Sequence, residues 1–324
     1  MRIHVFFHDH CFDGAASAAV FTRFYETCMH PGSEFSYTGL AHKASQLFDE
    51  SLFDGNENAI VDFKYSTSPK LNWWFDHHQS AFLKPEDADH FHQDRSGKKF
   101  FDPNYKSCTK LIATITKEKF GFETPDLADL IHWADIVDGA LFPNAETAVI
   151  MQPPALRIAL VMEAGPDGGL SQWLIPKMTT TPLSEIVKED RISRAFQPLF
   201  EQHMHSLEYI RQVGKCDRGV VFFDLTSPGI EVYNKFVPYY LFPECVYSVS
   251  VSPSSFRTKI SVGSNPWNQE KAVHNLATIC ERYGGGGHPR VGAISLAPDS
   301  KEKALAIAHE VVTELQSPPE IIKS

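Results

Sequence analysis

Short β-rich runs alternate with helical or polar segments in the N-terminal part of the chain. The runs IHVFF (3–7) and FSYTG (35–39) flank DGAASAAVFTRFYE (13–26), whose small and apolar residues follow a helical spacing. Two further runs, NAIVDF (58–63) and NWWFD (72–76), continue the series. Strands that alternate with helices at this spacing indicate βαβ units and a parallel sheet. We therefore predict an α/β fold for this part of the chain.

Predicted helices fill the middle of the chain. SCTKLIATITKEKFG (107–121) reads as a Ser-capped helix that ends at Gly121, and TPDLADLIHWADIVDG (124–139) as a helix with Pro in its first turn. The residues between about 140 and 215 are mostly helical by the same criteria. Their last part, 184–213, has the length and polar face of a connecting helix.

The pattern changes after Gly214, where β-rich runs such as CVYSVSVS (245–252) return. A chain of 324 residues also exceeds the usual size of one hydrophobic core. We therefore predict an N-terminal parallel-sheet domain over 1–183, a helical connector over 184–213, and a smaller α/β domain with a mixed sheet over 214–324.

The composition argues against several classes of protein. No apolar stretch approaches the roughly 18–20 residues that span a bilayer, and the start of the chain turns polar too soon for a signal peptide. The six Cys have no CxxC spacing, which predicts neither a disulfide framework nor a zinc knuckle but a reduced, cytoplasmic protein. The net charge of −10 argues against stable binding to duplex DNA, which usually needs a basic face. It does not exclude an anionic substrate, because bound divalent cations can reverse the local field.

Acidic and histidine side chains follow three of the predicted strands. His8, Asp9 and Asp13 lie at the end of the first strand and in the turn after it. Asp62 stands at the end of the third strand, and the fourth ends in Asp76-His77-His78. Ligands of an open parallel sheet bind beyond the carboxyl ends of its strands. We therefore expect these side chains to meet at one edge of the sheet.

Their chemistry indicates a metal site. Asp135 and Asp138, from a predicted helix, can return to the same edge. Carboxylates mixed with imidazoles suit manganese, magnesium or iron, and two such ions about 3.5–4 Å apart activate water in phosphoester hydrolysis. Each residue alone also has a plainer interpretation, as a turn or helix-capping residue or as a polar loop. The joint pattern, in which these acidic elements fall where strands should end, favours the site.

The motifs resemble those of the DHH phosphoesterase superfamily. FDHH after a hydrophobic strand, VDF before it, and DG after the first strand follow the order of that family. YGGGGHPRVGAISL (283–296) resembles the Gly-rich signature of the DHH-associated domain. The family includes RecJ-type exonucleases, nanoRNA and pAp phosphatases, cyclic-dinucleotide phosphodiesterases and exopolyphosphatases. The resemblance extends from residue 8 to about residue 296 and implies a catalytic N-terminal domain and a substrate-binding C-terminal domain.

The resemblance also implies roles for single residues. Asp62 is the expected bridging metal ligand, His78 is expected to face the substrate phosphate, and Asp76 to orient an imidazole. At the fourth motif, Asp135 is preferred over Asp138. Cys11 stands where the family often has an acid, so that His8 or Asp9 is expected to replace that carboxylate. The implied metal ligands are His8, Asp9, Asp13, Asp62, His77 and Asp135, and the implied catalytic residues are His78 and Asp76.

The Gly-rich segment is predicted to bind a substrate phosphate. Glycines permit positive φ and close approach of successive N–H groups to an anion. The plainer alternative is a flexible linker, which the strand-like RVGAISL directly after the segment disfavours. The family often has Arg-Ser where this chain has Gly263-Ser264. The expected substrate-binding residues are Gly285, Gly286, Gly287, His288, Arg290, Arg257 and Asn265, with Lys259 as a further candidate.

These features together predict a manganese-dependent phosphoesterase. Two Mn²⁺ ions, or Mg²⁺ or another divalent ion in their place, are expected to activate a water that attacks a phosphodiester or phosphomonoester. The expected substrate is a nucleotide or a short single-stranded oligonucleotide. We expect no membrane partner and no stable binding to duplex DNA, and the oligomeric state is left open. Two other functions stay open: an exopolyphosphatase or pyrophosphatase that cleaves phosphoanhydrides, and a non-catalytic nucleotide-sensing module.

Overall fold

A five-stranded parallel sheet forms the centre of the N-terminal part of the molecule. The computed structural model describes residues 1–41, 50–165 and 168–317. The chain divides into two units, the first comprising residues 1–142 and 151–199, the second 143–150 and 200–324. This division runs through the long helix α9 (Asp190–Val213), which overlaps the predicted connector. The functional boundaries at 183 and 213 stay a prediction.

The sheet of the first unit has the strand order β2-β1-β3-β4-β5, with every neighbouring pair parallel. Its strands are β1 (Arg2–His8), β2 (Glu34–Leu40), β3 (Glu57–Val61), β4 (Trp73–Asp76) and β5 (Lys99–Phe101). The sheet grows to one side of β1 with β2 and to the other with β3. Such a switch in strand order opens a crevice at the carboxyl ends of the two flanking strands.

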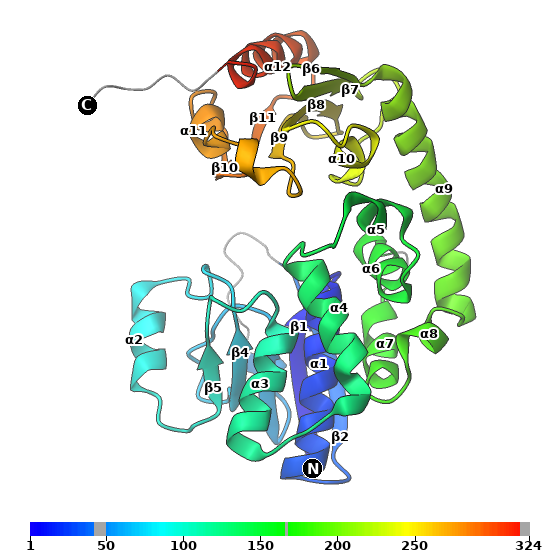
Figure 1. The fold of residues 1–324 in the computed structure, drawn as a ribbon. Coiled ribbons are helices and arrows are strands. Elements are labelled where there is room, and N and C mark those ends of the chain that lie inside the picture. Colours follow the sequence, from blue (N-terminus) through cyan, green and yellow to red (C-terminus); the bar gives the residue numbers. More distant parts are fainter. Residues whose placement is uncertain (42–49, 166–167, 318–324) are drawn as a thin grey trace. The chain divides into compact units, whose positions relative to one another are not determined.

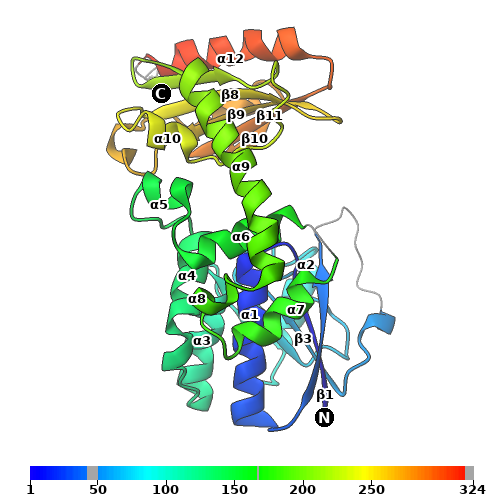
Figure 2. The same ribbon diagram turned by 90° about the vertical axis from the view of Figure 1, so that its right-hand side faces the viewer.

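Helices cover one face of this sheet. Alternate side chains of β1, among them Ile3, Val5 and Phe7, pack under α1 (Phe12–Phe24), with α3 (Cys108–Phe120) and α4 (Ala128–Asp138) beside it (Figures 1 and 2). Nearly every residue of α1 is buried, because its alanines and glycine let neighbouring elements approach on several sides. The α1 segment continues into a π-helical turn at Tyr25–Met29.

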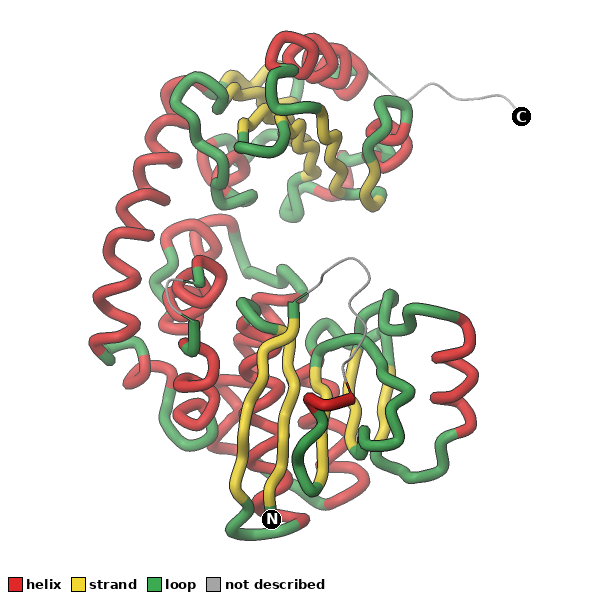
Figure 3. Tube along the Cα trace, turned by 180° about the vertical axis from the view of Figure 1, so that it is seen from behind, coloured by secondary structure: helices red, strands yellow, loops and turns green. Residues whose placement is uncertain are grey.

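The opposite face carries a second core, made by the side chains that alternate with the first set. Phe6, Ile60 and Trp74 lie here together with Tyr65 and other aromatic residues. Figure 3 shows this face, where loop segments rather than long helices cross the strands. The short helix α2 (Pro85–Gln93) contributes Phe91 to the same cluster. Alternation along the strands thus buries both faces, as a parallel sheet requires.

The predicted helix over 107–121 is confirmed as α3, with both predicted ends. The Ser107 hydroxyl accepts a hydrogen bond from the amide of Lys110, and Gly121 adopts a left-handed φ of 69°. Predicted helix 124–139 corresponds to a 3-10 turn at Pro125–Leu127 followed by α4. The helical middle is confirmed as well, by α5 (Ala145–Ile150), α6 (Pro154–Ala164), α7 (Leu170–Met178), α8 (Leu183–Ile186) and α9.

A mixed six-stranded sheet organises the second unit, as predicted. Its order is β10-β11-β9-β8-β7-β6, and all neighbouring pairs are antiparallel except β7 with β8. The helix α12 (Lys301–Leu315) lies along one face (Figure 2) and covers a core that includes Val249 and Ile260. The other elements are β6 (Lys215–Asp217), β7 (Val220–Asp224), α10 (Val237–Leu241), β8 (Tyr247–Pro253), β9 (Thr258–Ser264), α11 (Leu276–Glu281), β10 (Gly286–His288) and β11 (Val291–Leu296).

Among the described helices, none combines the length and the apolar character that a membrane span requires.

Candidate metal centre

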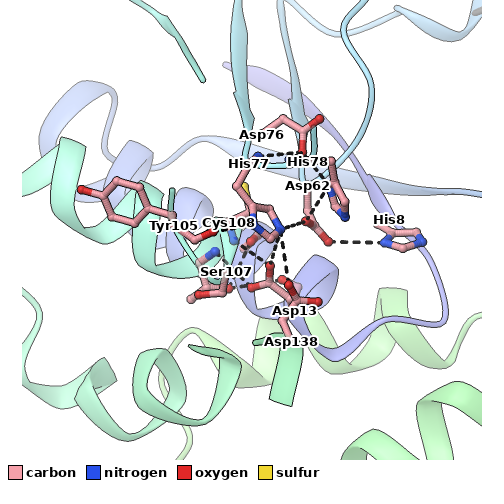
Figure 4. A network of polar contacts seen from close by, with 12 residues as sticks. His8, Asp13, Asp62, Asp76, His77, His78, Tyr105, Ser107, Cys108 and Asp138 are labelled. Atoms are coloured by element: carbon pink, nitrogen blue, oxygen red, sulfur yellow. Dashed lines mark hydrogen bonds and ion pairs between the residues drawn. The ribbon is translucent and has the colours of Figure 1, made fainter. Parts of the chain in front are cut away.

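The strand register brings the predicted acidic and histidine residues together. Phe7 of β1 pairs with Val61 of β3, and Val61 pairs with Phe75 of β4, so the residues that follow them leave the sheet side by side. The amide of Asp62 donates to the carbonyl of Phe75, which continues the pairing past the last strand residue. Figure 4 shows the resulting cluster, which His8, Asp62 and His77 enter from three neighbouring strands.

Asp62 is the central residue of the cluster. Its side chain is 1% exposed, and neither carboxylate oxygen has a hydrogen-bond partner. Oδ2 lies 3.4 Å from Nδ1 of His8, and Oδ1 lies 3.4 Å from Nε2 of His77. Burial raises the pKa of Asp62, but the neighbouring imidazoles of His77 and His8 lower it by more, so that the pKa is about 2. A buried, charged carboxylate with one oxygen directed at each of two groups suits a bridging ligand.

The backbone at Asp62 is also unusual, because φ is 57°. Aspartate and asparagine tolerate this left-handed conformation better than most residues, at a cost of order 1–2 kcal/mol. The left-handed turn directly after β3 holds the carboxylate at the edge of the sheet. Strained backbone of this kind often accompanies functional sites.

His77 is fixed in one orientation by the main chain. Its Nδ1 lies 3.1 Å from the carbonyl oxygen of Tyr105, which can only accept, so Nδ1 carries the proton and the lone pair of the neutral ring is on Nε2. Nε2 is buried without a hydrogen-bond partner and lies within 3.8 Å of Asp13, Asp62 and Asp138. A lone pair that faces three carboxylates is the arrangement that a cation between them would satisfy.

The neighbouring carboxylates also affect the pKa of His77. Burial lowers the pKa of His77, but Asp62, Asp13 and Asp138 raise it by more, to about 10. The site therefore attracts positive charge.

Asp13 lies between α1 and α3. Its two oxygens accept hydrogen bonds from the amides of Cys108 and Thr109, at 2.7 and 3.0 Å. Burial and the nearby Asp62 and Asp138 raise the pKa of Asp13 well above its usual value. Gly14 permits this approach of α1 to β1, because a Cβ there would clash with the carbonyl of His8. The predicted Asp13 thus reaches the cluster from the first turn of a helix.

Asp76 forms a hydrogen bond with His78, the contact that its expected role requires. Oδ1 of Asp76 accepts from the amides of His77 and His78 and from Nδ1 of His78, the last at 2.7 Å. The proton on Nδ1 leaves the lone pair of the neutral ring on Nε2. The hydrogen bond that His78 donates to Asp76 raises the pKa of His78 against the opposing effect of burial. The His78 side chain is 31% exposed and that of His77 only 8%, so His78 is the more accessible imidazole.

Asp138, rather than the preferred Asp135, brings its carboxylate to the cluster, so the geometry reverses that preference. The Oδ2 atom of Asp138 lies 3.4 Å from Nε2 of His77. Asp135, one turn earlier on α4, accepts a hydrogen bond from the hydroxyl of Ser107 at 3.1 Å. The two aspartates share one face of the helix, and only the last turn of α4 reaches the strand ends.

Asp9 is the other predicted ligand that the structure does not bring to the cluster. One carboxylate oxygen accepts from the hydroxyl of Ser171 at 2.7 Å and from the amide of His10, and the carboxylate packs over Gly39 of β2. It therefore links β2 and α7. Its sequence position beside His8 does not distinguish a metal ligand from such a structural link.

Three overlapping groups of donor atoms remain, each with its atoms within 4.8 Å of one another. His8, Cys11 and Asp62 form the first, Asp62, His77 and His78 the second, and Asp13, His77 and Asp138 the third. The buried oxygens of Asp62 and Nε2 of His77 lack hydrogen bonds and face shared space. The donors therefore fit divalent cations. Sequence reasoning left the part of Cys11 in this set unassigned.

Two of the predicted substrate-binding residues of the second unit, Asn265 and Arg290, make hydrogen bonds within the protein. Asn265 is 1% exposed, and its amide is fully used: it donates to the carbonyls of Pro243 and Cys245 and accepts from the amide of Trp267. It clamps a turn and has no free group for a substrate, so this expectation is corrected. Arg290 donates to the carbonyl of Ala272.

The Gly-rich segment is a short edge strand rather than a loop. Gly286 to His288 form β10 and pair with β11, so part of this backbone is engaged in the sheet. Positive φ occurs at Gly284 and Gly287. His288 is exposed, and the guanidinium of Arg257 donates to the hydroxyl of Ser295 and lies over the ring of Phe256. Gly285 is closely packed, because a Cβ there would clash with the carbonyl of Ala293.

Comparison with known proteins identifies the fold. No protein-family model matches the sequence, and no curated protein sequence matches it. A solved structure of the pGpG-specific phosphodiesterase PggH from Vibrio cholerae is similar, with 18% identity and a TM-score of 0.67 over 96% of this chain and 99% of that one. RecJ from Thermus thermophilus in complex with Mn²⁺ gives 14% identity and a TM-score of 0.53 over 98% of this chain, but this chain spans only 53% of RecJ.

The DHH domain of a protein assigned to a family of ribosomal proteins gives 12% identity and a TM-score of 0.52, over 98% of this chain and 87% of that one. The similarity extends over both units, although sequence identity is low in each case. With a cluster of buried His and Asp residues at the expected sheet edge, the chain has the fold of the DHH-domain phosphoesterases.

Proposed function

We propose that this protein is a divalent-metal-dependent phosphoesterase. The observation that carries the proposal is the set of buried atoms without hydrogen bonds, both oxygens of Asp62 and Nε2 of His77, which lie among further carboxylates. Leaving such groups without a partner costs free energy, and a bound cation removes that cost. The fold, shared with phosphodiesterases and nucleases, supports the same conclusion.

The donors divide between two positions that Asp62 connects. One position has His8 near Oδ2 of Asp62, and the other has His77, Asp13 and Asp138 near Oδ1. We propose that each position holds one divalent ion, with Mn²⁺ as the first candidate for the position that contains His77, where all donors are oxygen or nitrogen. Two ions held at these positions would supply a reactive water at neutral pH and would neutralise charge on a phosphate.

The surrounding residues prepare the site for this chemistry. The carbonyl of Tyr105 holds the lone pair of His77 on the nitrogen that faces the carboxylates. The amides at the start of α3 hold Asp13, and the left-handed turn holds Asp62. These groups are fixed before substrate binds, which reduces the reorganisation needed during the reaction.

His78 is the proposed catalytic imidazole. Asp76 raises the pKa of His78, and a protonated His78 ring can donate from Nε2 to a phosphate oxygen or to the leaving oxygen. The greater exposure of His78 compared with His77 supports this division between a residue that faces substrate and a residue that holds metal.

We propose a nucleotide or a short oligonucleotide as substrate. The support is the similarity to PggH, a pGpG-specific phosphodiesterase, over nearly the full length of both chains. In the second unit, the exposed His288 and the strand residue Gly286 are the proposed contacts to a substrate phosphate, with Arg257 as a nearby cation. Asn265 is not part of this proposal.

The test is a hydrolysis screen with metal-free protein. Linear pGpG, pAp, short oligoribonucleotides and tripolyphosphate are offered with and without added Mn²⁺, and the Asp62→Asn variant serves as the control for contaminating activity. We expect Mn²⁺-dependent cleavage of at least one nucleotide and its loss in the variant. Undiminished hydrolysis in excess EDTA would overturn the metal mechanism. Faster cleavage of tripolyphosphate than of any nucleotide would overturn the substrate class.

A further inference from the structure

We propose that the thiolate of Cys11 is a metal ligand in the position that contains His8. This inference rests on the proposed function but goes beyond it, because it assigns sulfur to one of the two positions and none to the other. It thereby predicts two positions with different metal preferences.

The location of Cys11 leaves its sulfur available. Cys11 precedes α1 as the N-cap residue, with extended backbone at φ −124° and ψ 131°. Its carbonyl accepts the amide of Ala15, but its side chain makes no capping hydrogen bond. An N-cap position usually carries a Ser, Thr, Asp or Asn whose side chain closes the helix end. The helix therefore gives no reason for a cysteine here.

The neighbours of Cys11 give that reason. Its Sγ, a ring nitrogen of His8 and a carboxylate oxygen of Asp62 all lie within 4.8 Å of one another. Asp62 is 1% exposed and has no hydrogen bond to either oxygen, and Oδ2 is the oxygen that faces His8. A buried carboxylate directed into a space lined by a thiol and an imidazole lacks a positive charge. Thiolate, imidazole and carboxylate are all established ligands of divalent transition metals.

Cys108 provides an internal comparison. It is fully buried near the same site, but its sulfur donates to the carbonyl of Phe75 at 3.3 Å, and its amide donates to Asp13. Among the described residues, the donor groups include Cys11 and not Cys108. Proximity to the cluster is thus not enough, and the geometry separates the two cysteines.

The two positions differ in chemical softness as a result. His8, Cys11 and Asp62 offer nitrogen, sulfur and oxygen, whereas Asp13, His77 and Asp138 offer one nitrogen and two oxygens. Thiolate favours Zn²⁺, Fe²⁺ or Co²⁺ over Mg²⁺, while carboxylate-rich sites accept Mg²⁺ and Mn²⁺. We infer that the position with Cys11 selects a borderline transition metal and that the other position accepts a harder ion.

Cobalt tests this inference without relying on activity. Metal-free protein is titrated with Co²⁺ while near-ultraviolet absorption is followed, because a thiolate bound to Co²⁺ produces a sulfur-to-metal charge-transfer band. We expect this band to develop with one of two equivalents. Cys11→Ser should abolish the band and weaken that equivalent at least about tenfold, the lower bound found when residues that only orient a ligand are removed.

Three further variants make the result specific. Cys28→Ser, at an exposed cysteine of the same unit, and Cys108→Ala should both keep the band. Cys11→Asp should lose the band, retain two equivalents, and bind Mg²⁺ better relative to Zn²⁺ than the native protein does. A second readout is alkylation of Cys11, followed by mass spectrometry, which Zn²⁺ should slow in native protein.

The outcomes separate this inference from the proposed function. Two equivalents of Co²⁺ without a charge-transfer band would overturn the role of Cys11 and leave the phosphoesterase proposal intact. A band that survives Cys11→Ser but disappears in Cys108→Ala would show that Cys108 supplies the sulfur. That result would also overturn the inference. Failure of the native protein to bind any Co²⁺ would overturn both proposals together.

Discussion

The two units differ in how completely their buried polar groups are hydrogen-bonded. At the sheet edge of the first unit, Asp62, Asp76 and His77 each have a buried atom without a hydrogen bond. In the described part of the second unit only Nε2 of His274 is in that state, and residues such as Asn265 and Tyr239 are paired. Buried polar groups are normally satisfied. Their concentration at one edge therefore marks binding chemistry, whereas the pairing in the second unit marks structural support.

The largest expected effect comes from substitution of the adjacent histidines, His77 and His78. His77→Ala should remove metal and reduce kcat/KM by at least about 100-fold, since it deletes a buried donor at the site. His78→Gln should keep both metal equivalents but reduce kcat by about 100-fold or more, because it removes the proposed acid. Metal content by mass spectrometry and steady-state kinetics measure both effects, with His92→Ala on α2 as the control. Equal metal loss in both variants would contradict the division of roles.

The converse substitution lies in the second unit. Asn265→Ala should lower the free energy of unfolding by about 2–3 kcal/mol, because it leaves two carbonyls and one amide without their partners. Metal stoichiometry at the first unit should not change. Denaturant unfolding and metal analysis of the same preparation measure the two quantities. A stable variant with a raised KM would instead support the rejected role of Asn265 in substrate binding.

Gly286 and Gly285 separate substrate contact from packing. A Cβ at Gly286 meets no atom within 4 Å, whereas one at Gly285 clashes with the carbonyl of Ala293. Gly286→Ala should therefore fold normally and raise KM several-fold if the strand approaches a phosphate, since one charge-assisted hydrogen bond contributes about 1.5–3 kcal/mol. Gly285→Ala should mainly lower the melting temperature. An unchanged KM in stable Gly286→Ala protein would argue against this contact.

Asp138→Asn should raise the stability of the metal-free protein while it weakens metal binding. Asp138 lies near Asp62 and Asp13, and neutralising one of three carboxylates relieves like-charge repulsion. We expect a modest increase in melting temperature without metal and a loss of the extra stabilisation that Mn²⁺ gives the native protein. Asp135→Asn is the matched control on the same helix. A lower metal-free melting temperature for Asp138→Asn would show that its charge is needed for folding.

The smallest expected effect is a pH dependence in the second unit. Nε2–H of the buried His203 donates to the carbonyl of Val149, and burial lowers the pKa of His203 below its usual value. As pH falls through about 6.5, the imidazole of residue 203 is therefore protonated in the unfolded chain before it is protonated in the folded protein. The contribution of neutral His203 to stability is complete above that pH and decreases below it. Unfolding free energies at about pH 7.5 and about pH 5.5 should differ less in His203→Gln than in native protein.

Much of the fold was predictable because it is encoded locally. The strands of the first sheet follow from β-rich runs, and α3 from its caps at Ser107 and Gly121. The three-residue strands β5 and β6 carry too little pattern to be recognised. Asp135 and Asp138 are three residues apart on one helix face, so only tertiary packing distinguishes them. Asn265 illustrates the same limit, because a turn clamp and a substrate ligand use the same amide groups.

The two imidazole orientations differ in what a single mutation can change. The partner of His77 is the main-chain carbonyl of Tyr105, which every amino acid at position 105 would retain. The partner of His78 is the side chain of Asp76, which one codon change removes. The proposed metal-holding histidine is therefore robust to drift at its orienting residue, whereas the proposed catalytic histidine can be retuned. A lineage that alters its chemistry at this site can therefore change the orientation of His78 through position 76, while the ring of His77 keeps its main-chain partner.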